Sequence, residues 1–242
     1  QPSQADSFQT VKGGGHGDYR LIALAPASVQ EMADFVGLAF DLAFKYRNPA
    51  IILADGVIGQ MMEKVVLPEQ RPRLTNEEVM ARCPWATFGK LKHRGPNIVT
   101  SLELDPAEME KRNIHLQQKY AEIEEKEVRY EEIHCDDAEY LIVAFGSCAR
   151  IAQKAMEEAR AEGIKVGLLR PITLWPVPSK AIAERSRQVK GILTVELNAG
   201  QMVEDVRLAV ECKVPVEYFG RLGGIVPDPD EVVTALKEKI IK

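Results

Sequence analysis

Residues 139–176 contain two hydrophobic patterns: short apolar runs typical of strands and, between them, apolar residues at helical spacing. The rest of the chain is organised around this stretch. Residues 140–145 form a short apolar run that ends at Gly146, which is typical of a strand buried on both faces. Apolar residues then recur at helical spacing as far as Gly163, with Ser147 as the expected N-cap. A second apolar run begins at Val166. A strand–helix–strand unit of this kind has parallel strands, so the pattern predicts an open α/β sheet.

The residues that follow extend the same predicted sheet. Residues 191–198 predict a third strand and residues 200–212 a third helix. A fourth strand is expected at 214–219, where Pro215 either places the strand on an edge or marks its first residue. A last helix is expected after its cap at Asp228. In such sheets a ligand crevice lies at the carboxyl ends of the strands. The expected lining is Gly146, Ser147, Glu196, Asn198 and residues 220–224.

The N-terminal residues contain a smaller α/β pattern. Residues 1–20 are predicted to form a loop, followed by a strand at 21–25, a helix from the capping-box residue Ser28 to about Arg47, and a buried strand at 49–55. The helix is apolar nearly all round, which requires burial on more than one side. Two strands and one helix cannot cover their own apolar faces. The expectation is therefore that this piece is the last part of a larger α/β domain, or that another chain completes it.

Between these regions the sequence is polar and interrupted by prolines. Residues 63–137 predict an extended linker in which Trp85, Phe88 and Leu91 are isolated anchors. A charged helix is expected from Asp105 to about Glu132, and a solvated helix that bridges two domains is the favoured interpretation. The predicted division is 1–64, 65–138 and 139–242.

Composition excludes several classes of function. The 242 residues carry a net charge of −5, so there is no basic footprint for nucleic acid. No apolar run is long enough to span a bilayer, and a membrane partner is not expected. The four cysteines form no C-x-x-C pair, which argues against a zinc or iron–sulfur site in this chain and predicts a reducing, cytoplasmic location with inert thiols.

No short motif identifies a reaction. The glycine-rich residues 12–18 lack Gly-Lys-Ser/Thr and lead into a strand, so a phosphate loop is rejected. Residues 146–149 are not G-x-G-x-x-G, which rejects a dinucleotide fold. No Ser/His/Asp or Cys/His set stands out among the scattered histidines. The residues alone therefore predict an architecture without a reaction.

Several long motifs in fixed order resemble a known family across essentially all 242 residues. They are similar to the α subunit of a 2-oxoacid:ferredoxin oxidoreductase, with the 2-oxoisovalerate (branched-chain) type first and the 2-oxoglutarate type second. The motifs are Gln1-Pro-Ser-Gln-Ala-Asp, Lys12-Gly-Gly-Gly-His-Gly-Asp-Tyr-Arg-Leu-Ile, Ala25-Pro-Ala-Ser-Val-Gln-Glu-Met, Leu53-Ala-Asp-Gly-Val-Ile-Gly-Gln-Met-Met, Leu169-Arg-Pro-Ile-Thr-Leu-Trp-Pro and Gly220-Arg-Leu-Gly-Gly.

The resemblance implies a thiamine-dependent enzyme that decarboxylates a 2-oxoacid and forms an acyl-CoA. It implies electron transfer through [4Fe-4S] clusters, held by partner subunits, to ferredoxin. The fold implied is the last part of a domain that holds the aminopyrimidine end of thiamine, then the linker, then a transketolase-C-terminal-like domain. Thiamine diphosphate and its Mg²⁺ would lie at the interface with the β subunit.

The family's glutamate that protonates the aminopyrimidine ring, and its Tyr-Pro-x-Thr-Pro motif, have no counterpart in this sequence. No catalytic residue and no metal ligand is therefore assigned, and the chain alone is expected to be inactive. Gln4, His16 and Asp18 are the candidates for contacts near thiamine, substrate or the partner chain, although a role in holding the loop is the favoured interpretation for His16 and Asp18. The alternative function is a non-catalytic subunit-docking module, which predicts an exposed apolar patch along residues 29–44.

Overall fold

A computed structural model describes residues 1–87, 92 and 94–241 of the chain. They divide into two compact units, one made of residues 1–66 and 116–242 and the other of residues 67–115, and each is described by itself. The predicted anchors Phe88 and Leu91 lie outside the described residues.

The larger unit contains the predicted open sheet, in the order β3-β5-β4-β7-β8. Strands β5, β4, β7 and β8 are parallel to their neighbours, and only the edge strand β3 is antiparallel. This arrangement confirms the mostly parallel α/β fold, with the strand that follows Pro215 at the other edge. The strands are β3 (Tyr130–Ile133), β4 (Tyr140–Ala144), β5 (Val166–Pro171), β7 (Ile192–Glu196) and β8 (Val216–Gly220).

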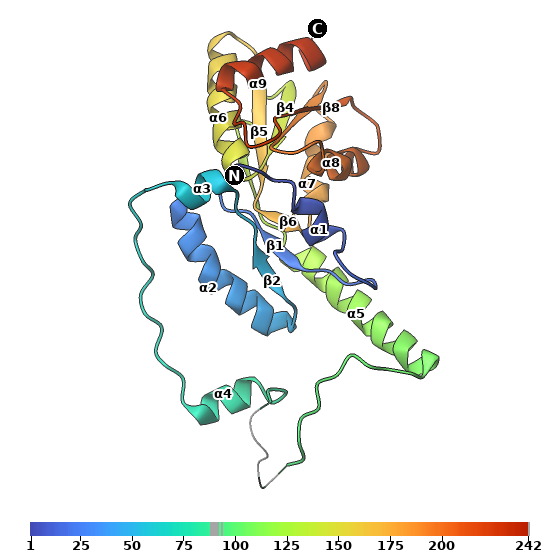
Figure 1. Cartoon of the computed structure of the whole chain (residues 1–242). Helices are drawn as coiled ribbons and strands as arrows, with labels where there is room; N and C mark the ends of the chain where they lie inside the picture. Colours follow the sequence, from blue (N-terminus) through green and yellow to red (C-terminus); the bar gives the residue numbers. More distant parts are fainter. Residues whose placement is uncertain (88–91, 93, 242) are drawn as a thin grey trace. The chain divides into compact units, whose positions relative to one another are not determined.

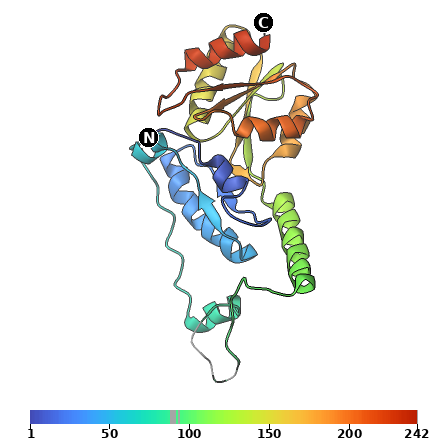
Figure 2. The same cartoon turned by 45° about the vertical axis from the view of Figure 1, so that its right-hand side comes forward.

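Two pairs of helices cover the two faces of this sheet (Figures 1 and 2). Helices α6 (Gly146–Ala161) and α9 (Pro229–Leu236) pack on one face, where Ile142 of β4 is fully buried among their apolar residues. Helices α7 (Ser179–Ser186) and α8 (Met202–Val210) pack on the other. Alternate residues of β4 thus enter opposite halves of the core, which explains why its sequence is apolar throughout.

A second sheet has three strands in the order β2-β1-β6. Strands β1 (Ile22–Leu24) and β2 (Ala50–Ile52) are parallel, as predicted, with helix α2 (Val29–Tyr46) between them in the chain. Residues 21–55 were expected to need completion by the rest of a larger domain or by another chain, and a third strand comes instead from a later part of this same chain. Strand β6 (Thr173–Trp175) pairs antiparallel with β1, so the apolar run that begins at Val166 serves both sheets.

Helix α2 begins at the predicted cap but exposes part of its apolar surface. Ser28 Oγ accepts a hydrogen bond from Glu31 N at 3.1 Å, whereas the Glu31 carboxylate accepts from Ala27 N instead of closing a capping box on Ser28. One side of the helix is buried, but Val36, Phe40 and Phe44 are 48%, 63% and 53% exposed. These three exposed apolar side chains lie on the helix where the docking interpretation expects an apolar patch larger than an ordinary monomer exposes.

Two predicted element boundaries need correction. Residues 1–20 are not all loop, because Ser7–Val11 form the short helix α1. The charged helix α5 (Pro106–Lys126) ends earlier than predicted, and Tyr130 starts strand β3. Beyond α5, Glu127 is buried and accepts a hydrogen bond from Tyr46 Oη at 2.6 Å, which fastens the end of α2 to the segment before β3.

The smaller unit contains helix α4 (Asn76–Arg82), which opens with a capping box between Thr75 and Glu78. Asn97 Nδ2 donates to the carbonyl oxygens of Pro84 and Ala86 at 2.7 and 2.8 Å, and so closes a loop after that helix. Among the described residues, no helix has the length and apolar character needed to cross a membrane.

Arg170 on β5 connects the C-terminal sheet to α2 through an ion pair with Glu31. Its guanidinium donates two hydrogen bonds to the Glu31 carboxylate, at 2.6 and 3.1 Å, and Nε lies 3.2 Å from a Glu131 oxygen. We expect Arg170→Met to lower the free energy of unfolding by about 2 kcal/mol, below the usual cost of breaking a buried pair because both carboxylates are partly solvated.

Urea titration measures this loss. Arg187→Met, at an exposed position near the end of α7, is the matched control and should change stability by less than about 0.5 kcal/mol. Equal effects of the two substitutions would contradict the role assigned to Arg170.

Candidate functional site

A buried polar cluster lies where the carboxyl ends of strands from both sheets meet. Its members come from the segment before α1, the turn after β2, the start of α6 and the turn after β7. They are Gln4, Asp55, Ser147, Glu196 and Asn198, all at most 7% exposed. Four of them were expected near the ligand crevice or among the candidate contacts. Asp55 was not.

Asp55 joins the two sheets through both of its carboxylate oxygens. Oδ1 caps helix α3 (Gly56–Gln60) by accepting from Val57 N at 2.9 Å and Ile58 N at 3.2 Å. Oδ2 accepts from Ser147 Oγ at 2.6 Å and from Ser147 N at 3.2 Å. The sequence predicted Ser147 as the N-cap of α6, but Phe145 occupies that position. Ser147 lies inside the first turn and directs its hydroxyl to Asp55.

Gly146 permits this close approach. Its φ of +57° lies in the left-handed region. A Cβ atom there would lie 2.9 Å from Gln4 Nε2 and 3.2 Å from Asp55 Oδ2. The glycine at the carboxyl end of β4 thus brings its backbone against the Asp55 carboxylate, and any larger residue would separate the two.

Gln4 connects the ends of β4 and β7. Its Nε2 donates to Phe145 O at 2.9 Å, and its Oε1 accepts from Leu197 N at 3.1 Å. Its backbone N–H donates to Leu197 O, and its carbonyl oxygen accepts from Asn198 Nδ2. Both ends of the amide are used within the chain, so Gln4 fixes the N-terminal segment across the rim of the sheet.

Glu196 is fully buried beside the first turn of α8. Its carboxylate accepts from the backbone N–H groups of Met202 and Val203 at 2.7 and 2.9 Å, as well as from Gln201 N and Asn198 Nδ2. Burial raises the pKa of the Glu196 carboxyl, and these hydrogen bonds oppose the rise by favouring the charged form. All four donors belong to the protein, so this carboxylate holds the turn after β7.

His16 and Asp18 lie apart from the buried cluster. Both are exposed in the glycine-rich segment that follows α1, where Gly13 and Gly17 have positive φ and Tyr19 Oη accepts from Gly14 N. The Asp18 carbonyl accepts from Gln117 Nε2 at 3.3 Å. The structure thus does not bring His16 and Asp18 together with Gln4.

The space left beside the buried polar cluster is small. The cavity beside Gln4, Asp55 and Gly146 has a volume of about 20 Å³, room for no more than a single water molecule. The polar groups around it are bonded to one another. We therefore derive no catalytic step from the cluster, which instead shapes the rim of the sheet.

The four cysteines are free thiols. Cys148 and Cys135 are buried, and burial raises the pKa of both thiols, that of Cys135 to about 11. Cys83 is buried and Cys212 is exposed. Within the described residues no group of three or more histidine, cysteine, aspartate or glutamate side chains could hold a metal ion.

Asp55 could be recognised in the sequence only by its position. An acidic residue that directly follows a buried strand and precedes Gly56 and an apolar turn is a signal for a helix cap. Its second partner, Ser147, is 92 positions away in the sequence, and no local pattern predicts that contact.

We predict that Asp55 and Ser147 act as one unit in stability. Asp55→Ala removes a helix cap and leaves the Ser147 N–H buried without an acceptor, and should cost about 3 kcal/mol of unfolding free energy. Ser147→Ala should cost about 1 kcal/mol. The double variant should be no less stable than Asp55→Ala, because the hydroxyl has already lost its acceptor.

The exposed cap Thr75 provides the control, since Thr75→Ala removes a capping box within the smaller unit and should cost no more than about 1 kcal/mol. Chemical denaturation of all four variants tests the prediction. Strictly additive losses for Asp55 and Ser147 would contradict it.

Known protein families match both regions of the chain. The family described as "Pyruvate flavodoxin/ferredoxin oxidoreductase, thiamine diP-bdg" matches residues 1–133, and "Pyruvate:ferredoxin oxidoreductase core domain II" matches residues 138–232. The fold is similar to that of a 2-oxoglutarate:ferredoxin oxidoreductase from Magnetococcus marinus, with a TM-score of 0.75 and 22% identity, over 98% of this chain and 45% of that one.

Curated relatives show the same relationship in sequence. The chain is 48% identical to the ketoisovalerate oxidoreductase subunit VorB of Methanothermobacter marburgensis, over 98% of this chain and 65% of that protein's length. It is 32% identical to the 2-oxoglutarate synthase subunit KorA of the same species, over 97% of this chain and 68% of the relative. On these matches the chain belongs to the 2-oxoacid:ferredoxin oxidoreductase family.

Proposed function

We propose that this chain belongs to a subunit of a thiamine-diphosphate-dependent oxidoreductase that converts 2-oxoisovalerate to its acyl-CoA and passes the electrons to ferredoxin. The observation that carries this proposal is the 48% identity to ketoisovalerate oxidoreductase subunits of two Methanothermobacter species, over 98% of the chain. The identity to 2-oxoglutarate synthase subunits is lower, at 31–33%. A branched-chain 2-oxoacid is therefore favoured over 2-oxoglutarate.

The proposal assigns the chain to the part of the assembly that faces the aminopyrimidine end of thiamine. Thiamine diphosphate supplies the electron sink for decarboxylation, while the protein supplies binding and positioning. The cavity beside Gln4 and Asp55 is too small for a cofactor, and within the described residues no group of three or more histidine, cysteine, aspartate or glutamate side chains could hold a metal ion. The diphosphate end with Mg²⁺, and the [4Fe-4S] clusters, are accordingly assigned to a β subunit and an iron–sulfur subunit. A cytoplasmic complex is part of this proposal.

Within this proposal the three candidate contacts have different tasks. Both ends of the Gln4 side-chain amide form hydrogen bonds within the chain and hold the N-terminal segment on the rim. Gln4 therefore positions this segment and does not itself contact the cofactor or the substrate. His16 and Asp18 are exposed on the glycine-rich segment and are available to a cofactor, a substrate or a partner chain. The residue division 1–64, 65–138 and 139–242 is retained as the proposed domain organisation.

The substrate is tested with the complex reconstituted from this chain, the β subunit and the iron–sulfur subunit. Reduction of a viologen dye should depend on CoA and thiamine diphosphate, and kcat/KM should be at least about tenfold higher for 2-oxoisovalerate than for 2-oxoglutarate. The chain by itself should show no turnover. Preference for 2-oxoglutarate, or full activity of the isolated chain, would contradict the proposal.

The same complex tests the assignment of His16. His16→Ala should raise the KM for substrate or the concentration of thiamine diphosphate needed for half-maximal activity by several-fold, because an exposed polar contact contributes about 1 kcal/mol. His115→Ala, at an exposed position on α5, is the control. Unchanged kinetics for both variants would show that His16 only holds its loop.

The exposed apolar side chains of α2, which form a stripe that includes Val36 and Phe40, support a docking role. Val36 and Phe40 lie four residues apart on one side of the helix, and both are about half exposed. Grouped apolar side chains at a surface mark protein–protein contacts more often than scattered ones. We propose that this stripe contacts another subunit of the same assembly.

Phe40→Glu should therefore reduce the fraction of chain found in the reconstituted complex, as sized by light scattering, because a carboxylate would have to be desolvated at the contact. Ile114→Glu replaces a similarly exposed apolar residue on the charged helix α5 and should leave assembly unchanged. Intact assembly of Phe40→Glu would reject the docking role without bearing on the substrate.

A further inference from the structure

The two sheets that the described residues form have four edge strands, and three of these are protected. The outer backbone groups of an edge strand can pair with another chain, and natural proteins usually cover or charge them. On β8, Arg207 donates to the outward carbonyl oxygen of Val216 at 3.1 Å. Lys239 likewise donates to that of Tyr218 at 2.8 Å. The β8 edge is therefore covered by side chains of its own chain.

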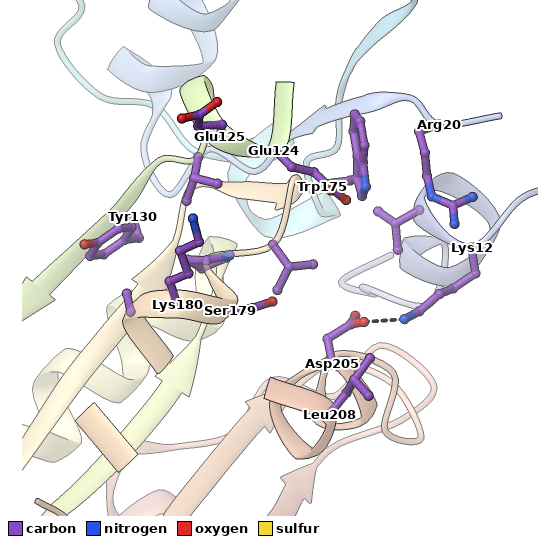
Figure 3. A pocket seen from close by; sticks show the side chains of 15 residues that line it. Lys12, Arg20, Glu124, Glu125, Tyr130, Trp175, Ser179, Lys180, Asp205 and Leu208 are labelled. Carbon is purple, nitrogen blue, oxygen red and sulfur yellow. Dashed lines mark hydrogen bonds and ion pairs between the residues drawn. The ribbon is translucent and has the colours of Figure 1, made fainter. Parts of the chain in front are cut away.

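Strands β3 and β6 are protected in other ways. β3 carries two adjacent carboxylates, Glu131 and Glu132, and charge on an edge strand opposes pairing with another chain. β6 is buried, with no residue more than 6% exposed. Its last residue, Trp175, faces a cavity of about 630 Å³ among residues of α1, α5, α7 and α8 (Figure 3). Neither edge is open to a further strand.

The outer side of β2 has no such cover. Pro49 O accepts a hydrogen bond from β1 and Leu53 N donates one to it, so positions 49, 51 and 53 turn their backbone groups toward β1. Ala50 and Ile52 therefore turn theirs outward, and in the described part of the chain nothing pairs with them. The strand carries no charge, and Ile51 is 38% exposed.

The same chain contains an extended segment with exposed apolar side chains. Residues 95–105, which lead into α5, form no helix, strand, turn or bend. Ile98, Leu102 and Leu104 are 81%, 71% and 83% exposed. Together with Thr100 they occupy every second position, which is the spacing of one face of a strand. Residues 97–104 are called the arm below.

One backbone side of the arm is free to pair. Arg112 donates to Thr100 O at 3.3 Å, which occupies the side of the even-numbered positions. Val99, Ser101 and Glu103 turn their backbone groups to the opposite side, where no partner occurs among the described residues. The arm thus has the backbone and the side-chain pattern of a strand that lacks a sheet.

The arm and the β2 edge match in an antiparallel pairing. With Glu103 opposite Ala50 and Ser101 opposite Ile52, the free backbone groups of both segments meet. The same register places Leu102 directly opposite Ile51, so that two exposed apolar side chains cover each other.

Charge favours this direction of pairing. It brings Glu103 and Asp105 to the start of β2, close to the end of α2. There Lys119 Nζ lies 3.5 Å from Arg47 O. Burial and the charge of Arg47 lower the pKa of Lys119, as a second cation nearby is expected to do. The acidic end of the arm therefore complements the cationic end of the edge.

Within its own chain the arm is kept away from this position. Pro106 and Lys119 are 13 positions apart on the continuous helix α5, which corresponds to about 20 Å. A second copy is free of this restraint, and the exchange can be reciprocal about a twofold axis. Two such contacts bury on the order of 1,500 Å², the standard size of a stable interface.

We propose that two copies of this chain dimerise by exchanging arms, each arm pairing antiparallel with the β2 edge of the other copy. Backbone hydrogen bonds from positions 99, 101 and 103 extend the small sheet, and Leu102 covers Ile51. The contact is independent of which 2-oxoacid the assembly uses.

An engineered disulfide tests the register. Ile51→Cys with Leu102→Cys, in a Cys212→Ser background that removes the exposed native thiol, should link two copies on mild oxidation. Residues directly opposite at such a position have Cα atoms about 4.5 Å apart, which a disulfide can span. The product should be a dimer in non-reducing gel electrophoresis and a monomer after reduction. Ile51→Cys with Ser101→Cys is the control and should stay monomeric, because position 101 lies on the other face of the arm.

Light scattering of the whole chain measures the dimer itself. Leu102→Glu should raise the Kd of the dimer by at least about tenfold, whereas Ile114→Glu, at an exposed apolar position on α5, should leave it unchanged. Ile52→Pro removes an outward N–H that β1 does not use and should also weaken the dimer, whereas Ile52→Val keeps that N–H and should not.

Thermal melting of every variant checks that the fold is intact. The proposal is overturned if the chain stays monomeric at about 100 μM, a concentration at which even a weak dimer is populated. It is equally overturned if the Ile51 and Leu102 cysteines link within one chain, or if Ile52→Pro dimerises as well as Ile52→Val.

Discussion

The fold depends on a buried carboxylate that two separate sheets share. Asp55 lies in the turn after β2. One of its carboxylate oxygens caps α3, and the other accepts two hydrogen bonds from Ser147. A buried carboxylate that lost these donors would be left with a large desolvation cost, so its partners constrain the start of α6 and the turn after β2 to one geometry. Gly146 is necessary for the same reason, because a side chain there would occupy the space between Asp55 and Gln4.

Two further ties make the sheets interdependent. Strand β6 continues the chain from β5 but pairs with β1, and Ala25 N donates to Ile172 O at 2.7 Å beside that pairing. Gln4 then bridges the ends of β4 and β7 with its side-chain amide. One contiguous set of buried apolar residues includes Ile22 of β1, Leu141 of β4 and Val206 of α8. The small sheet therefore shares its core and its rim with the large one. The polar cluster at the rim connects the two sheets, and this structural role is the one its contacts support.

The parts of the fold that follow from local pattern could be predicted from sequence. The apolar run at 140–145 and the amphipathic residues after Gly146 form β4 and α6, and Asp228 caps α9. Strand β6 could not be predicted, because its three residues continue the apolar run of β5 and only pairing with β1 separates them. The end of α5 was misplaced because Tyr130 falls at helical spacing, although its partner is Pro171 across an antiparallel edge. For the site, the ends of the predicted strands correctly indicated which residues line the rim of the sheet. The contact between Asp55 and Ser147 could not be predicted, because it forms only in the tertiary structure.

Hydrogen exchange under native conditions tests most directly whether the two sheets form one cooperative unit. The amides of Leu53, which donates to Leu24 O, and of Ala25 report on the small sheet, while that of Leu141, which donates to Gly191 O, reports on the large one. The shared carboxylate and shared core predict that these amides open with the same free energy and lose it together in Asp55→Ala. Small-sheet amides that exchange by a separate opening, several kcal/mol below that of Leu141, would contradict the account.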